Sequence, residues 1–323
     1  MSSETAQVFD FIINRRGGTV LNHGEDTVRK EILTQFGDKA GTFTYVEGKD
    51  VAATVKTWAA EHAGQNRGLV IGGGDGTVVT AVEQILGRDD IILGILPLGT
   101  QNLVARQLGF SADFKKAAAQ YKNGQSVEMD VGVVNDMHFL VGITLDQNSV
   151  NFFEAREDLR DKKHFSAIKK GVSSMTGVLA GAKDKFRVST EKGGHSGKSI
   201  SGRLIAITNN SVRPLAIKSL PYSGAEFKNI VTNMLGKGDQ STGELSLYAF
   251  KGGLIKIASI LPDIMSGKWD KHKSVERDSA QQFFVETDGA QQRSLILDGE
   301  IKKVQYPLEV RIIPNGVKMF KPQ

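Results

Sequence analysis

A strand that ends in successive glycines constrains this chain more than any other feature. The apolar residues 69–71 lead directly into the turn 72–77, which reads Gly-Gly-Gly-Asp-Gly-Thr. Glycines let the backbone bend sharply and bring bare N–H groups close to an anion such as phosphate. Apolar residues then recur with helical spacing over 78–86, and the N-terminus of such a helix adds positive potential at the same place. The pattern indicates a phosphate-binding turn, although a tight turn without a ligand has the same local sequence.

A second strand-to-helix turn follows closely. Residues 91–96 are all apolar or glycine, and they run through Pro97-Leu98-Gly99-Thr100-Gln101-Asn102 into the helix-like segment 103–108. Asn102 stands where a helix N-cap is expected. Two such turns are typical of neighbouring strands in a parallel sheet, whose carboxyl ends share one crevice. Since Asp75 repels a bare phosphate, we also expect a cation or a proton to be handled there.

The rest of the chain divides into two parts with different periodicity. Short apolar runs alternate with helical periods as far as about residue 125, which predicts a Rossmann-like parallel α/β domain. After Met129 the apolar runs 130–134, 138–141, 186–189, 203–207 and 245–249 are strand-like and separated by turn residues, which predicts an all-β domain of the sandwich type. We place the first domain at residues 1–127 and the second at 128–313.

Three motifs in this order resemble the catalytic signature of the diacylglycerol kinase and sphingosine kinase family. They are Gly73-Gly74-Asp75-Gly76-Thr77, then Pro97-Leu98-Gly99-Thr100-x-Asn102-x-x-Ala105-Arg106, then Leu295-Ile296-Leu297-Asp298-Gly299-Glu300. A weaker match lies at 11–18, where the family usually has Asn-Pro-x-Ser-Gly. The resemblance spans nearly the whole chain and implies an ATP-dependent lipid kinase of lipid metabolism, such as phospholipid biosynthesis. It also implies that the closing segment 314–323 returns to the first domain.

The resemblance and the chemistry of phosphoryl transfer together assign roles to residues. The predicted nucleotide-binding residues are Asn14, Gly72, Gly73, Gly74, Asp75, Gly76, Thr77, Gly99, Thr100 and Asn102. Asp298 is the predicted base for the lipid hydroxyl, with Glu300 beside it on an extended segment, so that mutual repulsion would raise one pKa. Asp75 is a rival base. Arg15, Arg16 and Arg106 are either phosphate partners or ordinary surface arginines.

Two departures from the family bear on magnesium and on the substrate. Many bacterial diacylglycerol kinases have Asp where this chain has Leu103, and an Asp-Asp-Gly where it has Ser241-Thr242-Gly243. Leucine cannot coordinate a cation, so we expect Mg²⁺ to depend on the ATP phosphates, on water and on Asp75. The acceptor is therefore predicted only as a lipid alcohol: diacylglycerol, ceramide or a sphingoid base.

Composition restricts the remaining possibilities. The chain of 323 residues has no cysteine, which excludes disulfides, thiolate metal sites and a cysteine nucleophile. Its start lacks the profile of a secretory signal, and the net charge is +5. We expect a cytoplasmic protein at the inner membrane surface, with the basic stretch 156–170 either touching anionic lipid or forming a solvated helix. A homodimer is left open, and nucleic acid is not an expected partner.

Two other functions compete with a lipid kinase. A NAD kinase shares the Gly-Gly-Asp-Gly turn, but its Thr-Gly-Ser-Thr-Ala-Tyr motif has no counterpart in this chain. A non-catalytic sensor of nucleotide or lipid would explain the missing acidic residues at Leu103 and Thr242. Turnover of a lipid would separate the leading interpretation from both.

Overall fold

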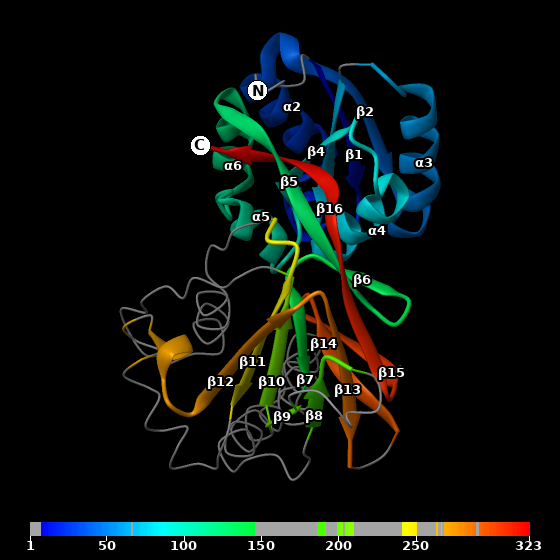
Figure 1. The fold of residues 1–323 in the computed structure, drawn as a ribbon. Helices are drawn as coiled ribbons and strands as arrows, with labels where there is room; N and C mark the ends of the chain where they lie inside the picture. Colours follow the sequence, from blue (N-terminus) through cyan, green and yellow to red (C-terminus); the bar gives the residue numbers. More distant parts are fainter. Residues whose placement is uncertain are drawn as a thin grey trace, which may run out of the picture. The chain divides into compact units, whose positions relative to one another are not determined.

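The computed structural model describes most of the chain, in two compact units. The described residues are 8–65, 67–145, 186–191, 199–202, 204–209, 241–250, 263, 266, 268–288 and 291–323. Unit 1 comprises Met1–Val131 with Ile313–Gln323, and unit 2 comprises Gly132–Ile312. Figure 1 shows the ribbon of both.

Unit 1 is built on a parallel sheet. Its strands lie in the order β2 (Ala40–Val46), β1 (Val8–Asn14), β3 (Arg67–Gly73) and β4 (Ile92–Pro97). The end of the long strand β16 (Leu308–Pro322) lies beside β4, also parallel, with Lys318 opposite Ile92. β3 and β4 are buried on both faces, which is why they consist almost entirely of apolar residues and glycine.

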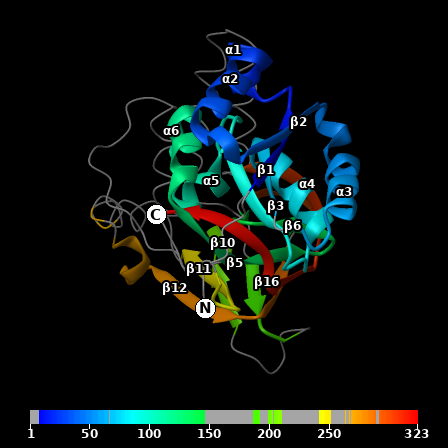
Figure 2. The same cartoon turned by 90° about the horizontal axis from the view of Figure 1, so that it is seen from above.

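Helices cover both faces of this sheet. They are α1 (Gly18–His23), α2 (Glu25–Phe36), α3 (Val51–Glu61), α4 (Asp75–Ile85), α5 (Leu103–Leu108) and α6 (Phe114–Ala119), with short 3₁₀ turns η1 (Gly37–Lys39), η2 (Gly48–Asp50) and η3 (Gln120–Lys122). α3 packs with α4, and α2 packs with α6, on opposite sides of the strands (Figure 2). The alternation of strand and helix that the sequence predicts is confirmed, and α4 begins three residues before the predicted start at 78.

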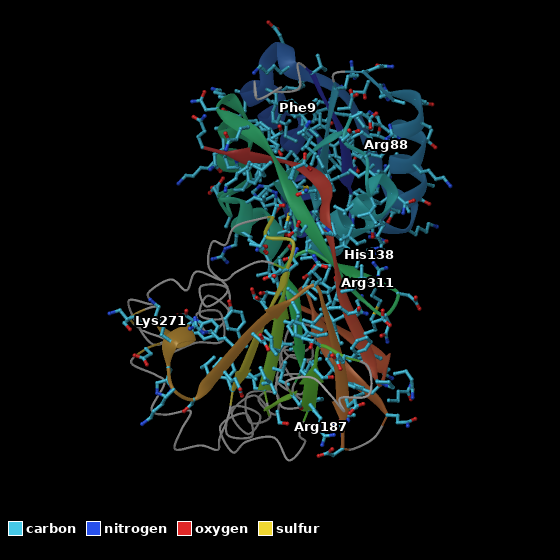
Figure 3. The ribbon with its side chains drawn as sticks, in the orientation of Figure 1. Phe9, Arg88, His138, Arg187, Lys271 and Arg311 are labelled. Carbon is cyan, nitrogen blue, oxygen red and sulfur yellow. The ribbon has the colours of Figure 1, made fainter. Side chains whose placement is uncertain are left out.

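An aromatic cluster joins the two ends of the chain within unit 1. Tyr121 stacks on Phe320 of β16 at 4.5 Å between ring centroids. Phe9 of β1, labelled in Figure 3, meets Tyr121 edge-on at 5.5 Å and Phe320 at 5.8 Å. The Tyr121 hydroxyl donates a hydrogen bond of 3.0 Å to the Ile95 carbonyl, so its one polar group is satisfied inside the core.

A buried carboxylate organises the amino-terminal part of β1, next to Phe9. Asp10 is 1% exposed and accepts hydrogen bonds from Arg67 Nε at 2.8 Å, the Thr42 N–H at 2.7 Å and Trp58 Nε1 at 3.0 Å. Burial by itself raises the pKa of Asp10, but the hydrogen bonds from Arg67, Thr42 and Trp58 outweigh it and hold the pKa well below its usual value. The charged carboxylate therefore ties β1 to β2, α3 and β3.

Unit 2 is a β-sandwich. One sheet contains β8 (Phe186–Ser189), β9 (Ser199–Gly202) and β13 (Gln282–Thr287), with the unit 2 parts of β5 (Gly124–Val134), β6 (Met137–Phe139) and β16. The other runs in the order β12 (Val275–Ala280), β11 (Leu245–Phe250), β10 (Leu204–Thr208), β7 (Gly142–Leu145), β14 (Gln292–Leu297) and β15 (Glu300–Gln305). A single 3₁₀ turn, η4 (Trp269–Lys271), precedes β12 in the described part.

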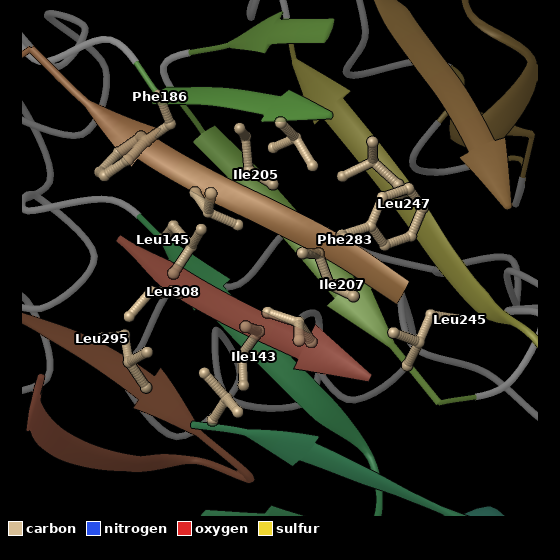
Figure 4. Packing of buried hydrophobic residues seen from close by; sticks show 14 of the residues in the cluster. Ile143, Leu145, Phe186, Ile205, Ile207, Leu245, Leu247, Phe283, Leu295 and Leu308 are labelled. Atoms are coloured by element: carbon tan, nitrogen blue, oxygen red, sulfur yellow. The ribbon is translucent and has the colours of Figure 1, made fainter. Parts of the chain in front are cut away.

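The core of unit 2 lies between its two sheets. Figure 4 shows Phe283 and Leu308 of one sheet packed with Ile143, Ile207 and other apolar residues of the opposite sheet. All the described strand pairs within unit 2 for which a register is known are antiparallel. The predicted fold class, a parallel α/β part followed by a β-sandwich, is confirmed.

One predicted segment, the basic stretch 156–170, falls outside the described residues. Within the part of the chain that the structure describes, no helix has the length and apolar character needed to cross a bilayer.

Candidate active site

The carboxyl ends of β1, β3 and β4 bring the two glycine turns and Asn14 together. Asn14 is the last residue of β1, and its Nδ2 donates to Thr77 Oγ1 at 3.1 Å. Its Oδ1 accepts from the Arg16 N–H at 3.0 Å. Asn14 therefore links the end of the first strand to the first turn of α4, which places it at the border of the predicted phosphate site.

The two glycine turns are bonded directly to each other. The Gly73 carbonyl accepts from the N–H groups of Leu98 and Gly99, each at 3.1 Å. A Cβ on Gly73 would lie 2.6 Å from Thr77 Cβ, and one on Gly99 would collide with the Cα of Gly74 and lie 2.9 Å from the Gly74 nitrogen. Gly99 is thus required by the packing of one turn against the other, a reason that the local sequence does not reveal, whereas Gly73 is required by Thr77 of its own turn.

Asn102 occupies the predicted N-cap position of α5 but does not cap it. Its backbone is left-handed, with φ of 53°, and its side chain makes no capping hydrogen bond. Instead, Oδ1 accepts from the Gly99 N–H and Nδ2 donates to the Gly99 carbonyl, both at 3.0 Å. The expected role is corrected: Asn102 closes the second turn on itself and holds Gly99 against Gly74.

Asp75 supplies the missing cap from the first turn. It is the first residue of α4, is 7% exposed, and accepts a hydrogen bond of 2.9 Å through Oδ1 from the Val104 N–H of α5. A carboxylate at a helix N-terminus is stabilised by the unpaired N–H groups there. Asp75 is therefore both a candidate base or magnesium contact and the residue that binds α5 to the glycine turn.

A guanidinium lies within electrostatic reach of Asp75. Burial lowers the pKa of Arg106, and the negative charge of Asp75 acts in the opposite direction. Leu103 is 7% exposed and packs as an apolar residue. This corner of unit 1 thus combines the carboxylate of Asp75 and the guanidinium of Arg106 with an apolar side chain.

The predicted nucleotide-binding residues accordingly gather at one edge of the sheet. Gly72 packs against Leu98: a Cβ added to Gly72 would lie 2.8 Å from Leu98 Cδ1. Gly76 follows Asp75 in α4, and Thr100 follows Gly99 in the second turn. For magnesium the donor set does not fit a protein-built site: the described residues contain no group of three His, Cys, Asp or Glu side chains that could hold a metal ion.

The late acidic pair has a different geometry from the one expected. Asp298 and Gly299 have φ of 46° and 83°, and Leu297 pairs with Glu300 across them. They form a two-residue hairpin turn between β14 and β15, so the expectation of an extended segment that directs both carboxylates to the same side is wrong. Glu300 is exposed, and its Oε2 forms an ion pair of 2.8 Å with Lys302 Nζ.

The Asp298 carboxylate is bound by a row of backbone donors. It is 5% exposed, and it accepts from the N–H groups of Leu140 at 2.7 Å and of Val141 and Gly142 at 2.9 Å each. The sequence had no signal for these three donors, because every non-proline residue carries a backbone N–H. Asp298 lies in unit 2 and the glycine turns in unit 1, so their approach across the units stays a prediction.

Comparisons with known proteins agree with the resemblance, and the family model covers the first two motifs. The model of the diacylglycerol kinase catalytic domain matches residues 9–134. A "Putative lipid kinase" of Streptococcus pneumoniae serotype 4 is 26% identical over 86% of this chain and 87% of its own length. A "Putative lipid kinase" of Staphylococcus aureus strain Mu3 is 26% identical over 78% of this chain and 76% of its own. A solved structure titled "A putative diacylglycerol kinase from Bacillus anthracis str. Sterne" shares the fold, with a TM-score of 0.65 at 17% identity over 98% of this chain and 97% of that one.

Proposed function

Because residues 9–134 match the model of the diacylglycerol kinase catalytic domain, we propose that the chain is an ATP-dependent lipid kinase. It transfers the γ-phosphoryl group of ATP to the hydroxyl of a membrane lipid, either diacylglycerol or a ceramide or sphingoid base. The observation that carries the proposal is the junction of the two glycine turns with Asn14 and Thr77 at the carboxyl edge of the parallel sheet. Ligands of α/β sheets bind at such an edge.

The donor nucleotide would lie against this junction. Asn14, the turn 72–77, Gly99, Thr100 and Asn102 form its binding site in the proposal. The bonds between Gly73, Leu98 and Gly99 make the site rigid before a nucleotide arrives, and rigidity of this kind lowers the entropy cost of binding. ATP would carry Mg²⁺ on its own phosphates, with Asp75 in contact through water.

The acceptor side requires a base. As the lipid hydroxyl oxygen bonds to the γ-phosphorus, the bond from that phosphorus to the β-bridging oxygen breaks, ADP leaves, and the hydroxyl proton passes to a carboxylate. Asp298 is the proposed base, with Glu300 next to it, and Asp75 is the rival. The three N–H bonds to Asp298 support a fixed orientation of that carboxylate.

Radiolabelled ATP and a panel of lipids test the function. Purified protein should label diacylglycerol, ceramide, sphingosine or monoacylglycerol in mixed micelles, and NAD should remain unlabelled. Asp298→Asn should lower turnover by at least about 100-fold, as expected for loss of a general base. Asp288→Asn is the matched control, since Asp288 also precedes a glycine and is exposed.

The outcomes separate the alternatives. Labelled NAD with no labelled lipid would favour a NAD kinase over a lipid kinase, and ATP binding without any transfer would support a sensor. If Asp75→Asn abolishes transfer whereas Asp298→Asn leaves it intact, the base is Asp75.

A further inference from the structure

The structure distinguishes the three arginines that the sequence marks near the phosphate turns. Arg15 Nε lies 3.6 Å from Glu25 Oε1, and Arg16 Nε lies 3.2 Å from Glu47 Oε2, with 71% of the Arg16 side chain exposed. Both are surface arginines that already face carboxylates, so we leave them out of the phosphate site. Within the described chain, the Arg106 guanidinium makes no hydrogen bond and no ion pair shorter than 4.0 Å.

Arg106 is held in place by the same elements that build the glycine turns. It lies on α5, whose other five residues are all buried, whereas Arg106 itself is partly exposed. Its backbone N–H donates to the Asn102 carbonyl at 3.1 Å, and two residues earlier Val104 is bonded to Asp75. The position of the Arg106 side chain is therefore coupled to both turns.

The chemistry of this corner suits an anion. The partly exposed guanidinium of Arg106 has five N–H donors and no protein acceptor among the described residues, so these donors are available to an anionic oxygen. The negative charge of Asp75 stabilises the cation from a distance and at the same time repels a bound phosphate. A phosphate placed between the two side chains would accept hydrogen bonds from Arg106. The positive charge of Arg106 would then offset the repulsion between the phosphate and Asp75.

We propose that Arg106 donates hydrogen bonds to a phosphate of the nucleoside triphosphate bound at the glycine turns. This rests on the proposed function, since it specifies which side chain neutralises the donor phosphates of that site. The arginine would compensate charge at the corner where this chain has Leu103 and the family resemblance implies a metal-binding carboxylate. The planar fork of a guanidinium suits a phosphate better than the point charge of a lysine does.

Calorimetric titration with ATP and with adenosine tests the proposal in the full-length protein. Arg106→Gln should weaken ATP binding by about 10- to 100-fold, the change expected for one or two charge-assisted hydrogen bonds. Adenosine affinity should stay within about twofold, because adenosine has no phosphate. Arg106→Lys should fall between the wild type and Arg106→Gln, and the surface variant Arg16→Gln should bind ATP as the wild type does.

Other outcomes would overturn the assignment. Equal ATP affinity in Arg106→Gln and the wild type would do so, and so would a parallel loss of ATP and adenosine binding, which marks a structural role. If Arg106→Gln does not fold, Arg106→Lys decides in the same way. If Arg106→Gln still phosphorylates lipid with an unchanged KM for ATP, the role of Arg106 is refuted and the kinase function stands. If Arg106→Gln binds ATP more weakly but the wild type transfers no phosphate to lipid, the role of Arg106 stands and the kinase function is refuted.

Discussion

Gly99→Ala should destabilise unit 1 because no space exists for a Cβ between the two turns. The added carbon would collide with the Cα of Gly74 and lie 2.9 Å from both the Gly74 nitrogen and Asn102 Oδ1. Both turns are fixed to strand ends, so neither yields easily. Overpacking of this kind costs about 1–3 kcal/mol. Displacing the Gly99 N–H from Gly73 and Asn102 adds about 1 kcal/mol more. The expected loss in the free energy of unfolding is about 2–4 kcal/mol.

The neighbouring glycine provides a matched control. A Cβ on Gly74 has the Cα of Gly99 as its nearest atom, at an ordinary 3.5 Å. Since Gly74 is the N-cap of α4, alanine there loses a favoured cap residue but also reduces the entropy of the unfolded chain. We expect the net change for Gly74→Ala to stay within about 1 kcal/mol.

Tryptophan fluorescence can report on unit 1 by itself. The chain has two tryptophans, and they are Trp58 in unit 1 and Trp269 in unit 2. In a Trp269→Phe background, urea unfolding followed through Trp58 measures the free energy of unfolding of unit 1 for each glycine variant. If Gly99→Ala and Gly74→Ala unfold with the same free energy, the close packing of the two turns is refuted.

Three further changes test other parts of the structure. Asp10→Asn should cost about 3 kcal/mol above pH 3.8, the low end for breaking a buried ion pair since Arg67 is partly exposed. Because folding lowers the pKa of Asp10, its contribution to the free energy of unfolding is lost as the pH falls below 3.8. The urea midpoints of the wild type and the variant should therefore converge in acid, and a constant difference between them would contradict this. Phe320→Ala should lower the stability of unit 1 by about 3–5 kcal/mol by emptying part of the aromatic cluster, and an unchanged Trp58 transition would argue against the placement of β16. Asp298→Asn should destabilise unit 2 by about 1–3 kcal/mol, because the new amide NH₂ would face a backbone N–H donor in place of the carboxylate oxygen that accepts its hydrogen bond. Thermal unfolding of Asp298→Asn and Asp288→Asn checks this, and equal transition temperatures would refute it.

Local pattern was sufficient for the elements of unit 1. The alternation of short apolar runs and helical periods predicted as far as about residue 125 corresponds to β1, α2, β2 and α3, followed by the two strand-to-helix turns. These elements form where apolar residues recur with the period of a buried strand or an amphipathic helix, and Gly37 ends α2. The gathering of Asn14 and the two glycine turns at one edge also followed, because parallel strands present their carboxyl ends together.

Side-chain roles were less accessible, for a physical reason. Asn102 was expected to cap α5 and instead holds Gly99, while Asp75, 29 residues before Val104, provides the cap. Asp298 was expected on an extended segment and instead turns back to bond three backbone N–H groups at 140–142. Repeating patterns along a chain encode which face of an element is buried. They do not encode which distant N–H a given carboxylate will meet, since that depends on how separate elements pack, and so these contacts emerge only when the chain is folded.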